Sequence, residues 1–150
     1  MEDSAALALI DQAFWGAPRP EHFTDFAHCD EHDRTFLQHT RESLSRRALS
    51  YPGWNPVSFT TSEGYRYYIP ALARIALSRK DGSEYLPQFV GDLRDELFIS
   101  FDAEQRSALA AFLEYLPARE SDIRSFYRPQ EILEQLDQAI QSLGHCGRGA

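Results

Sequence analysis

The sequence has little cysteine, little methionine and no long apolar run, and these shortages exclude several classes of protein. Its two cysteines, Cys29 and Cys146, could form at most one disulfide bridge, which is typical of a reducing compartment rather than a disulfide framework. No segment approaches the roughly 18 consecutive apolar residues of a membrane-spanning helix. The apolar run at residues 5–10 follows two acids and lacks the basic beginning of a signal peptide. We therefore expect a cytoplasmic protein that does not enter a membrane.

Strand-forming and catalytic patterns are also absent. Only residues 57–59 and 98–101 are short candidates for strands, and no internal repeat or low-complexity segment is present in the 150 residues. A chain of this length can bury one hydrophobic core without disulfides or metal. We predict a single all-α domain over residues 1–150, with residues 145–150 as a flexible tail. The sequence has no phosphate-binding loop, nucleophile elbow or His-Glu-x-x-His motif, so it assigns no catalytic residue and favours a non-enzymatic role.

Acidic residues exceed basic ones, mostly in the second half of the chain. The formal net charge is -8; residues 1–80 hold 10 acids and 9 basic residues, whereas residues 81–150 hold 13 and 6. A negative surface repels phosphate backbones and anionic lipids, so we expect no direct binding to nucleic acid or membrane. Such a surface attracts a basic protein partner, although net charge also serves solubility alone.

The segment at residues 60–77 predicts the helix around which the fold packs. Its apolar residues recur at the i, i+3, i+4, i+7 spacing of one helical face; they are Tyr65, Tyr68, Ile69, Leu72, Ile75 and Ala76. Thr60 and Glu63 have the spacing of a capping box, which predicts a helix over residues 61–78. Pro70 has no N–H group, so we expect a kink or a break there. Large side chains also lie off the main stripe, which predicts neighbours on two sides.

Apolar spacing, caps and prolines place the other helices, and about six of them should pack around the central helix at residues 61–78. We expect them at residues 4–14, 29–39, 40–48, 86–97, 102–116 and 129–143. Asp102 and Gln105 approximate a capping box, Pro117 should close that helix, and Gly144 should stop the last one.

Three acids on the predicted helix at residues 86–97 are candidates for binding a basic partner. Asp92, Asp95 and Glu96 lie opposite its apolar stripe, where they could steer such a partner toward the surface. On the central helix, Arg66 and Tyr67 fall off the stripe and could add an anchor, because Tyr and Arg are common at binding hot spots. An acidic face is often only solvated, and a Tyr-Arg cluster often belongs to the core. A toxin-neutralising or regulatory protein is the form of function that we favour.

A metal site is the alternative function. His28, Cys29 and His32 have the i, i+3 and i, i+4 spacings at which one helix could hold a zinc ion. A third or fourth ligand at recognisable spacing is missing from the sequence. Cys29 and His32 could equally be core residues, with His28 in solvent. We therefore assign no cofactor, and zinc stays the alternative.

The order of several motifs resembles a family of small bacterial proteins of unknown function. The motifs are His28-Cys29-x-Glu31, Phe59-x-x-Ser62, Tyr65-Arg66-Tyr67-Tyr68-Ile69-Pro70-Ala71, and Phe101-x-x-Glu104-Gln105-x-x-Ala108 with Phe112-Leu113. That family shares a Cys-x-Glu-Cys-like box, an aromatic-Tyr-Tyr-Leu-Pro-Ala helix and a late Glu-Gln helix, over about residues 5–116 of this chain. His32 replaces the second cysteine of the box, and Ser43 stands where a tryptophan would be expected, which leaves metal binding open and argues against redox chemistry. The resemblance implies a shared fold and no activity.

Overall fold

The computed structural model describes residues 1–25, 30–49, 56–78, 85–119 and 129–148. Within these ranges the chain forms seven α-helices, one 3-10 helix and no strand, which confirms the predicted all-α class. They are α1 (Asp3–Phe14), α2 (Asp30–Leu37), η1 (Pro56–Phe59), α3 (Ser62–Leu77), α4 (Tyr85–Gly91), α5 (Asp95–Ser100), α6 (Ala103–Arg119) and α8 (Pro129–Arg148). No helix in the described ranges has both the length and the apolar character needed to cross a bilayer.

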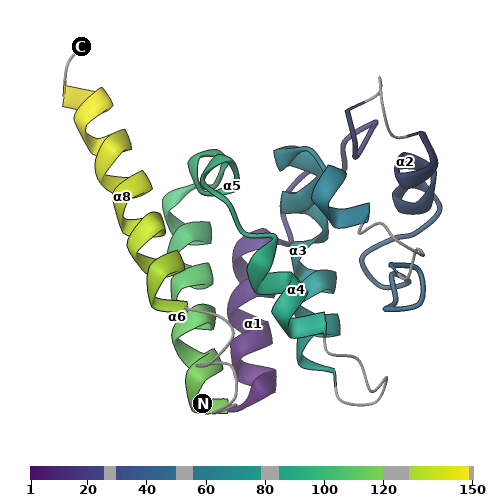
Figure 1. Ribbon diagram of the computed structural model, residues 1–150, viewed down its shortest axis with the longest axis horizontal. Coiled ribbons are helices and arrows are strands. Elements are labelled where there is room, and N and C mark those ends of the chain that lie inside the picture. Colours follow the sequence, from purple (N-terminus) through teal and green to yellow (C-terminus); the bar gives the residue numbers. More distant parts are fainter. Residues whose placement is uncertain (26–29, 50–55, 79–84, 120–128, 149–150) are drawn as a thin grey trace.

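The helix α3 lies in the middle of the arrangement (Figure 1). It packs against α1, α4 and α5, while α6 packs against α1 and α8. The helix α8 lies along α5 and α6 at one side of the molecule, and α2 lies at the opposite side (Figure 1). Aromatic rings from distant parts of the sequence meet between these helices. The rings of Phe14 and Phe101 are 5.0 Å apart and those of Phe89 and Phe112 are 5.6 Å apart, both edge to face.

The central helix is buried over most of its length. Eleven of the 16 residues of α3 are buried, which agrees with the prediction that neighbours cover it on two sides. Thr61 caps its N-terminus, because its hydroxyl oxygen accepts a bond of 3.1 Å from the N–H of Gly64. The predicted cap at Thr60 is wrong by one residue, since the Thr60 hydroxyl instead donates to the carbonyl of Val57 at 2.7 Å. The helix continues through Pro70 to Leu77, so it is not broken there.

The single helix predicted at residues 86–97 is in fact two helices. The helix α4 ends at Gly91 and α5 begins at Asp95. Arg94 precedes α5 with extended backbone angles, φ -147° and ψ 161°, so the helix cannot continue through it. The apolar spacing persists across the junction because Leu93 and Leu97 are both buried, and this persistence made one helix the expectation.

One other predicted helix is absent, and two helices end later than predicted. Residues 40–48 form turns rather than a helix, and in the first turn the Ser43 hydroxyl accepts a 2.8 Å bond from the N–H of Thr40. The helix α6 passes through Pro117 and ends at Arg119, and α8 passes through Gly144 and ends at Arg148. Only two residues of α6 follow Pro117 and only four of α8 follow Gly144, so a kink or a flexible residue there displaces little of either helix.

The start of α6 agrees with its predicted capping box. The N–H of Gln105 donates to the Asp102 carboxylate at 2.8 Å, and the N–H of Asp102 donates to the Gln105 side-chain oxygen at 3.0 Å. These reciprocal bonds satisfy two backbone donors that the first turn of a helix leaves open.

Candidate functional site

The three acids predicted to share one helix face have different environments. Asp92 follows α4 and is half-buried, and its carboxylate accepts bonds from the Ser58 hydroxyl at 3.3 Å and the Gln88 amide at 3.2 Å. Asp95 and Glu96 are exposed in the first turn of α5. The three acids therefore do not lie on one helix as predicted, because α4 ends at Gly91, before Asp92, and α5 begins at Asp95. Asp95 and Glu96 remain on the surface.

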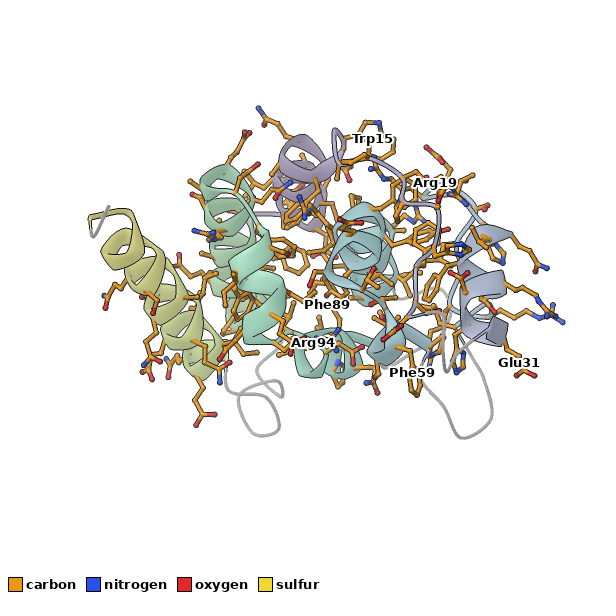
Figure 2. All side chains as sticks on the ribbon, turned by 90° about the horizontal axis from the view of Figure 1, so that it is seen from above. Trp15, Arg19, Glu31, Phe59, Phe89 and Arg94 are labelled. Atoms are coloured by element: carbon orange, nitrogen blue, oxygen red, sulfur yellow. The ribbon has the colours of Figure 1, made fainter. Side chains whose placement is uncertain are left out.

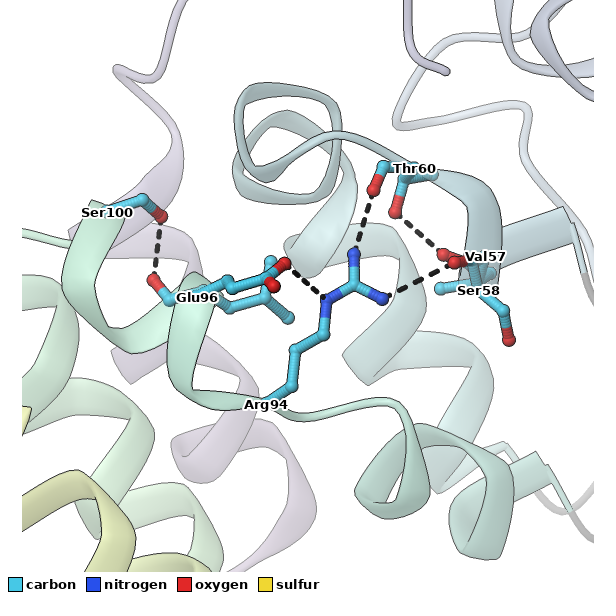
Figure 3. A network of polar contacts seen from close by, with 7 residues as sticks. Val57, Ser58, Thr60, Arg94, Glu96 and Ser100 are labelled. Atoms are coloured by element: carbon cyan, nitrogen blue, oxygen red, sulfur yellow. Dashed lines mark hydrogen bonds and ion pairs between the residues drawn. The ribbon is translucent and has the colours of Figure 1, made fainter. Parts of the chain in front are cut away.

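Arg94 joins this acidic turn to the segment before the central helix (Figure 3). Its guanidinium donates to the carbonyl of Thr60 at 2.9 Å and to that of Ser58 at 3.3 Å. It also approaches the Glu96 carboxylate at 3.6 Å, although the Glu96 side chain is 80% exposed. An ion pair of this length and exposure contributes little, so Glu96 keeps its capacity to bind another cation.

A pocket of about 350 Å³ lies beside these residues, between α5 and α8. Its lining is mostly polar and consists of Leu93, Arg94, Asp95, Glu96 and Gln135. On α5, Ile99 is 55% exposed, one helical turn after Asp95 and Glu96. On α8, the exposed Glu131 lies one turn before Gln135. Two carboxylates thus line the hollow, and an apolar side chain and a third carboxylate each lie one helical turn from a lining residue.

The other predicted partner-binding residues, Arg66 and Tyr67, are both half-buried. The hydroxyl of Tyr67 accepts a 3.1 Å bond from Arg19, and its ring packs 5.7 Å from that of Phe23. Figure 2 shows Arg19, which contacts Tyr67, well apart from Arg94, which contacts Glu96. The structure therefore does not bring Tyr67 together with Asp95 and Glu96 into one surface.

Arg19 contacts the end of α2, a role that the sequence did not predict. Its guanidinium donates to the carbonyls of His39 at 3.0 Å and Leu37 at 3.1 Å. The hydroxyl of Tyr68 donates to the same His39 carbonyl at 2.6 Å and also to the carbonyl of Phe36. The last carbonyls of a helix lack backbone donors and carry partial negative charge, so these contacts stabilise the end of α2.

Arg41 makes similar contacts at the end of α1 and is almost fully buried, with 5% of its surface exposed. Its three nitrogens donate to the carbonyls of Trp15 at 2.5 Å, Ala17 at 2.7 Å and Tyr67 at 2.7 Å. The guanidinium carbon lies 4.9 Å from the Trp15 ring and 4.3 Å from the Tyr67 ring. Burial lowers the pKa of Arg41 from its usual range, although Tyr67 and nearby acids act in the opposite direction. Arg19 and Arg41 therefore serve the fold, and neither is a free cation for a ligand.

The structure describes only one of the three predicted metal ligands, His32. His28 and Cys29 lie outside the described residues. The ring of His32 is buried and stacks on that of Phe59, with centroids 4.9 Å apart and an interplanar angle of 10°. Among the residues that the structure describes, no group of three His, Cys, Asp or Glu side chains has the geometry to hold a metal ion. Zinc at His28, Cys29 and His32 stays a prediction, which elemental analysis of protein purified without chelator would test.

A histidine–aspartate pair lies next to this region and was not predicted from the sequence. His22 Nδ1 is 2.8 Å from one carboxylate oxygen of the buried Asp33, and the other oxygen accepts a 2.6 Å bond from the N–H of Phe23. The pair joins the loop before α2 to the helix itself. The two residues are 11 positions apart, so neither helical nor strand periodicity could have linked them.

Comparison with known proteins gives one family. The model of the Family of unknown function (DUF6714) matches residues 4–138. A search of curated proteins and a search of solved structures each found no match.

Proposed function

The chain belongs to this family of unknown function, and we propose that it is an interaction protein that binds a basic protein partner at the α5–α8 pocket. The observation that carries the proposal is the exposure of Asp95 and Glu96 beside the pocket of about 350 Å³. A basic toxin is one example of the partner class.

The geometry favours a lysine or arginine side chain as the group that enters the pocket. A cation there lies between two carboxylates and a wall of protein, where charges attract more strongly than in open water. Arg94, the one cation among the described residues of the pocket lining, already donates to the carbonyls of Ser58 and Thr60. Its position is therefore set by the fold, and a partner's cation can bind on the exposed side of Glu96.

Ile99 extends the same surface with an apolar contact. It is 55% exposed and follows Asp95 by four residues on α5, so both side chains lie on one face. Charge mainly raises the association rate, whereas a desolvated apolar contact slows dissociation. The surface should thus prefer a partner that presents a basic and an aliphatic side chain together.

The test is selection of peptides from a random display library on the purified protein. We expect the selected peptides to be rich in Lys and Arg and to bind more weakly as salt increases. The double variant Asp95→Lys/Glu96→Lys should bind the best peptide at least about tenfold more weakly.

A matched control separates the pocket from the total charge. The double variant Glu21→Lys/Glu42→Lys changes the net charge by the same amount, at exposed positions that do not line the pocket. It should keep most of the binding. Peptides without basic residues, or equal losses in the two double variants, would contradict the proposal.

A further inference from the structure

Two tyrosine hydroxyl groups are buried without a hydrogen-bond partner. Tyr65 on α3 and Tyr85 on α4 are each only 1% exposed. Within the described structure, neither hydroxyl has a donor or an acceptor within hydrogen-bond distance. Tyr68, on the same helix as Tyr65, is also buried, but its hydroxyl has partners, because it donates to the carbonyls of Phe36 and His39.

The two phenol groups come from α3 and α4, which pack against each other, and both side chains are buried. Burial raises the pKa of Tyr65, and the neighbouring Tyr85 and Asp92 raise it further. Burial also raises the pKa of Tyr85, with Asp92 again acting in the same direction. The guanidinium carbon of Arg46 lies over the ring of Tyr85, 5.4 Å from its centroid.

Leaving both hydroxyls unpaired would be costly. A buried polar group without a partner loses its hydration and gains nothing in return, and two such groups would take a large share of the stability of a small domain. Buried polar groups in folded proteins almost always have a partner, and ordered water supplies it where the protein does not.

We infer that the α3–α4 interface binds one small hydrogen-bonding molecule of the size of water, held by the hydroxyl groups of Tyr65 and Tyr85. A molecule of this size can accept a bond from one hydroxyl and donate to or accept from the other. It needs at least two polar partners, and the two phenol hydroxyls supply them. The site is thus an internal polar link between the central helix and α4.

Tyrosine-to-phenylalanine substitution tests the inference. Stability should fall if the hydroxyls bind a shared molecule, and it should stay level or rise if they are unpaired. If each hydroxyl binds the shared molecule, Tyr65→Phe and Tyr85→Phe should each lower the folding equilibrium constant about tenfold in urea unfolding. Removing both hydroxyls leaves no orphaned group, so the double variant should be no less stable than the single ones. Tyr68→Phe calibrates the loss of direct bonds to backbone carbonyls.

The opposite results would overturn the inference. If the hydroxyls are truly unpaired, each single substitution should leave stability unchanged or raise it. Losses that add in the double variant would show two separate partners instead of one shared molecule. As a direct measurement, NMR of the wild-type protein should show cross-peaks between a bound water and both hydroxyl protons, and their absence would also count against the site.

Discussion

We expect the substitution Arg41→Lys to destabilise the protein by about 2–4 kcal/mol, because lysine keeps the charge but cannot reproduce the planar fork of the guanidinium. The three guanidinium nitrogens each bond a different carbonyl, on Trp15, Ala17 and Tyr67. A single ammonium group cannot reach all three in this geometry.

The magnitude follows from the contacts that are lost. A hydrogen bond to a charged group contributes about 1.5–3 kcal/mol, and lysine should lose at least one of the three. The guanidinium also lies 4.9 Å from the Trp15 ring and 4.3 Å from the Tyr67 ring, and such contacts contribute about 0.5–2 kcal/mol. Because Arg41 is only 5% exposed, water cannot easily replace the missing donors. The loss is large against a typical total stability of about 5–15 kcal/mol.

Urea unfolding followed by far-ultraviolet circular dichroism would measure the effect, with Arg74→Lys as the matched control. Arg74 is exposed and donates one bond, to the carbonyl of Leu44 at 2.9 Å, so the same substitution there should cost less than about 1 kcal/mol. If Arg41→Lys costs no more than Arg74→Lys, the view that Arg41 links α1 to α3 through its fork is refuted.

Three further results are expected from the same unfolding assay. A methyl group added at Gly64 would lie 2.8 Å from the carbonyl oxygen of Phe23, so Gly64→Ala should destabilise the protein by about 1–3 kcal/mol. A methyl group added at Gly91 meets no atom within 4 Å, so Gly91→Ala should be neutral or stabilising, and equal effects of the two substitutions would contradict the close approach at Gly64. Asp102→Ala removes the cap of α6 and should cost about 0.5–2 kcal/mol, and no loss would show that the cap does not contribute. Burial raises the pKa of Tyr68 to about 12, so its protonated form is favoured in the folded state, and stability should fall as the pH rises from about 10 toward 12. The variant Tyr68→Phe should lose less stability over this pH range than the wild type, and an equal loss would disagree.

The parts of the fold that follow from local patterns could be predicted from the sequence. The apolar stripe of α3 and the Asp102–Gln105 capping box depend on residues three or four positions apart, and the structure has both. The cap of α3 was placed one residue early because Thr60 and Thr61 are both suitable types. Contacts outside the helix decide between them, since the Arg94 guanidinium bonds the carbonyl of Thr60 and the N–H of Thr61 donates to the carbonyl of Phe23.

Features that depend on distant residues could not be predicted in the same way. The helix α4 ends at Gly91 and the extended backbone of Arg94 separates it from α5, although the apolar spacing continues across the junction. The Arg94 guanidinium contacts carbonyls more than 30 positions earlier, and no local pattern in the sequence indicates such a contact. Arg41 likewise stabilises parts of the chain that are distant in sequence, because the carbonyls it bonds lie 24 to 26 positions away. A side chain that completes the end of another helix leaves no periodic signal in its own segment.

The division between local and distant contacts also decides which acids can test partner binding. The sequence grouped Asp92 with Asp95 and Glu96 because all three follow one helical period. In the structure Asp92 accepts bonds from Ser58 and Gln88, so replacing it by lysine would disturb the junction of η1 and α4 as well as the surface charge. A loss of binding in a triple variant could then come from unfolding of that junction. Asp95 and Glu96 are exposed, and changing only these two alters the charge beside the pocket while keeping the contacts of Asp92 and the carbonyl bonds of Arg94. The double variant is therefore the sharper experiment, and an unchanged unfolding curve for it should accompany any loss of binding.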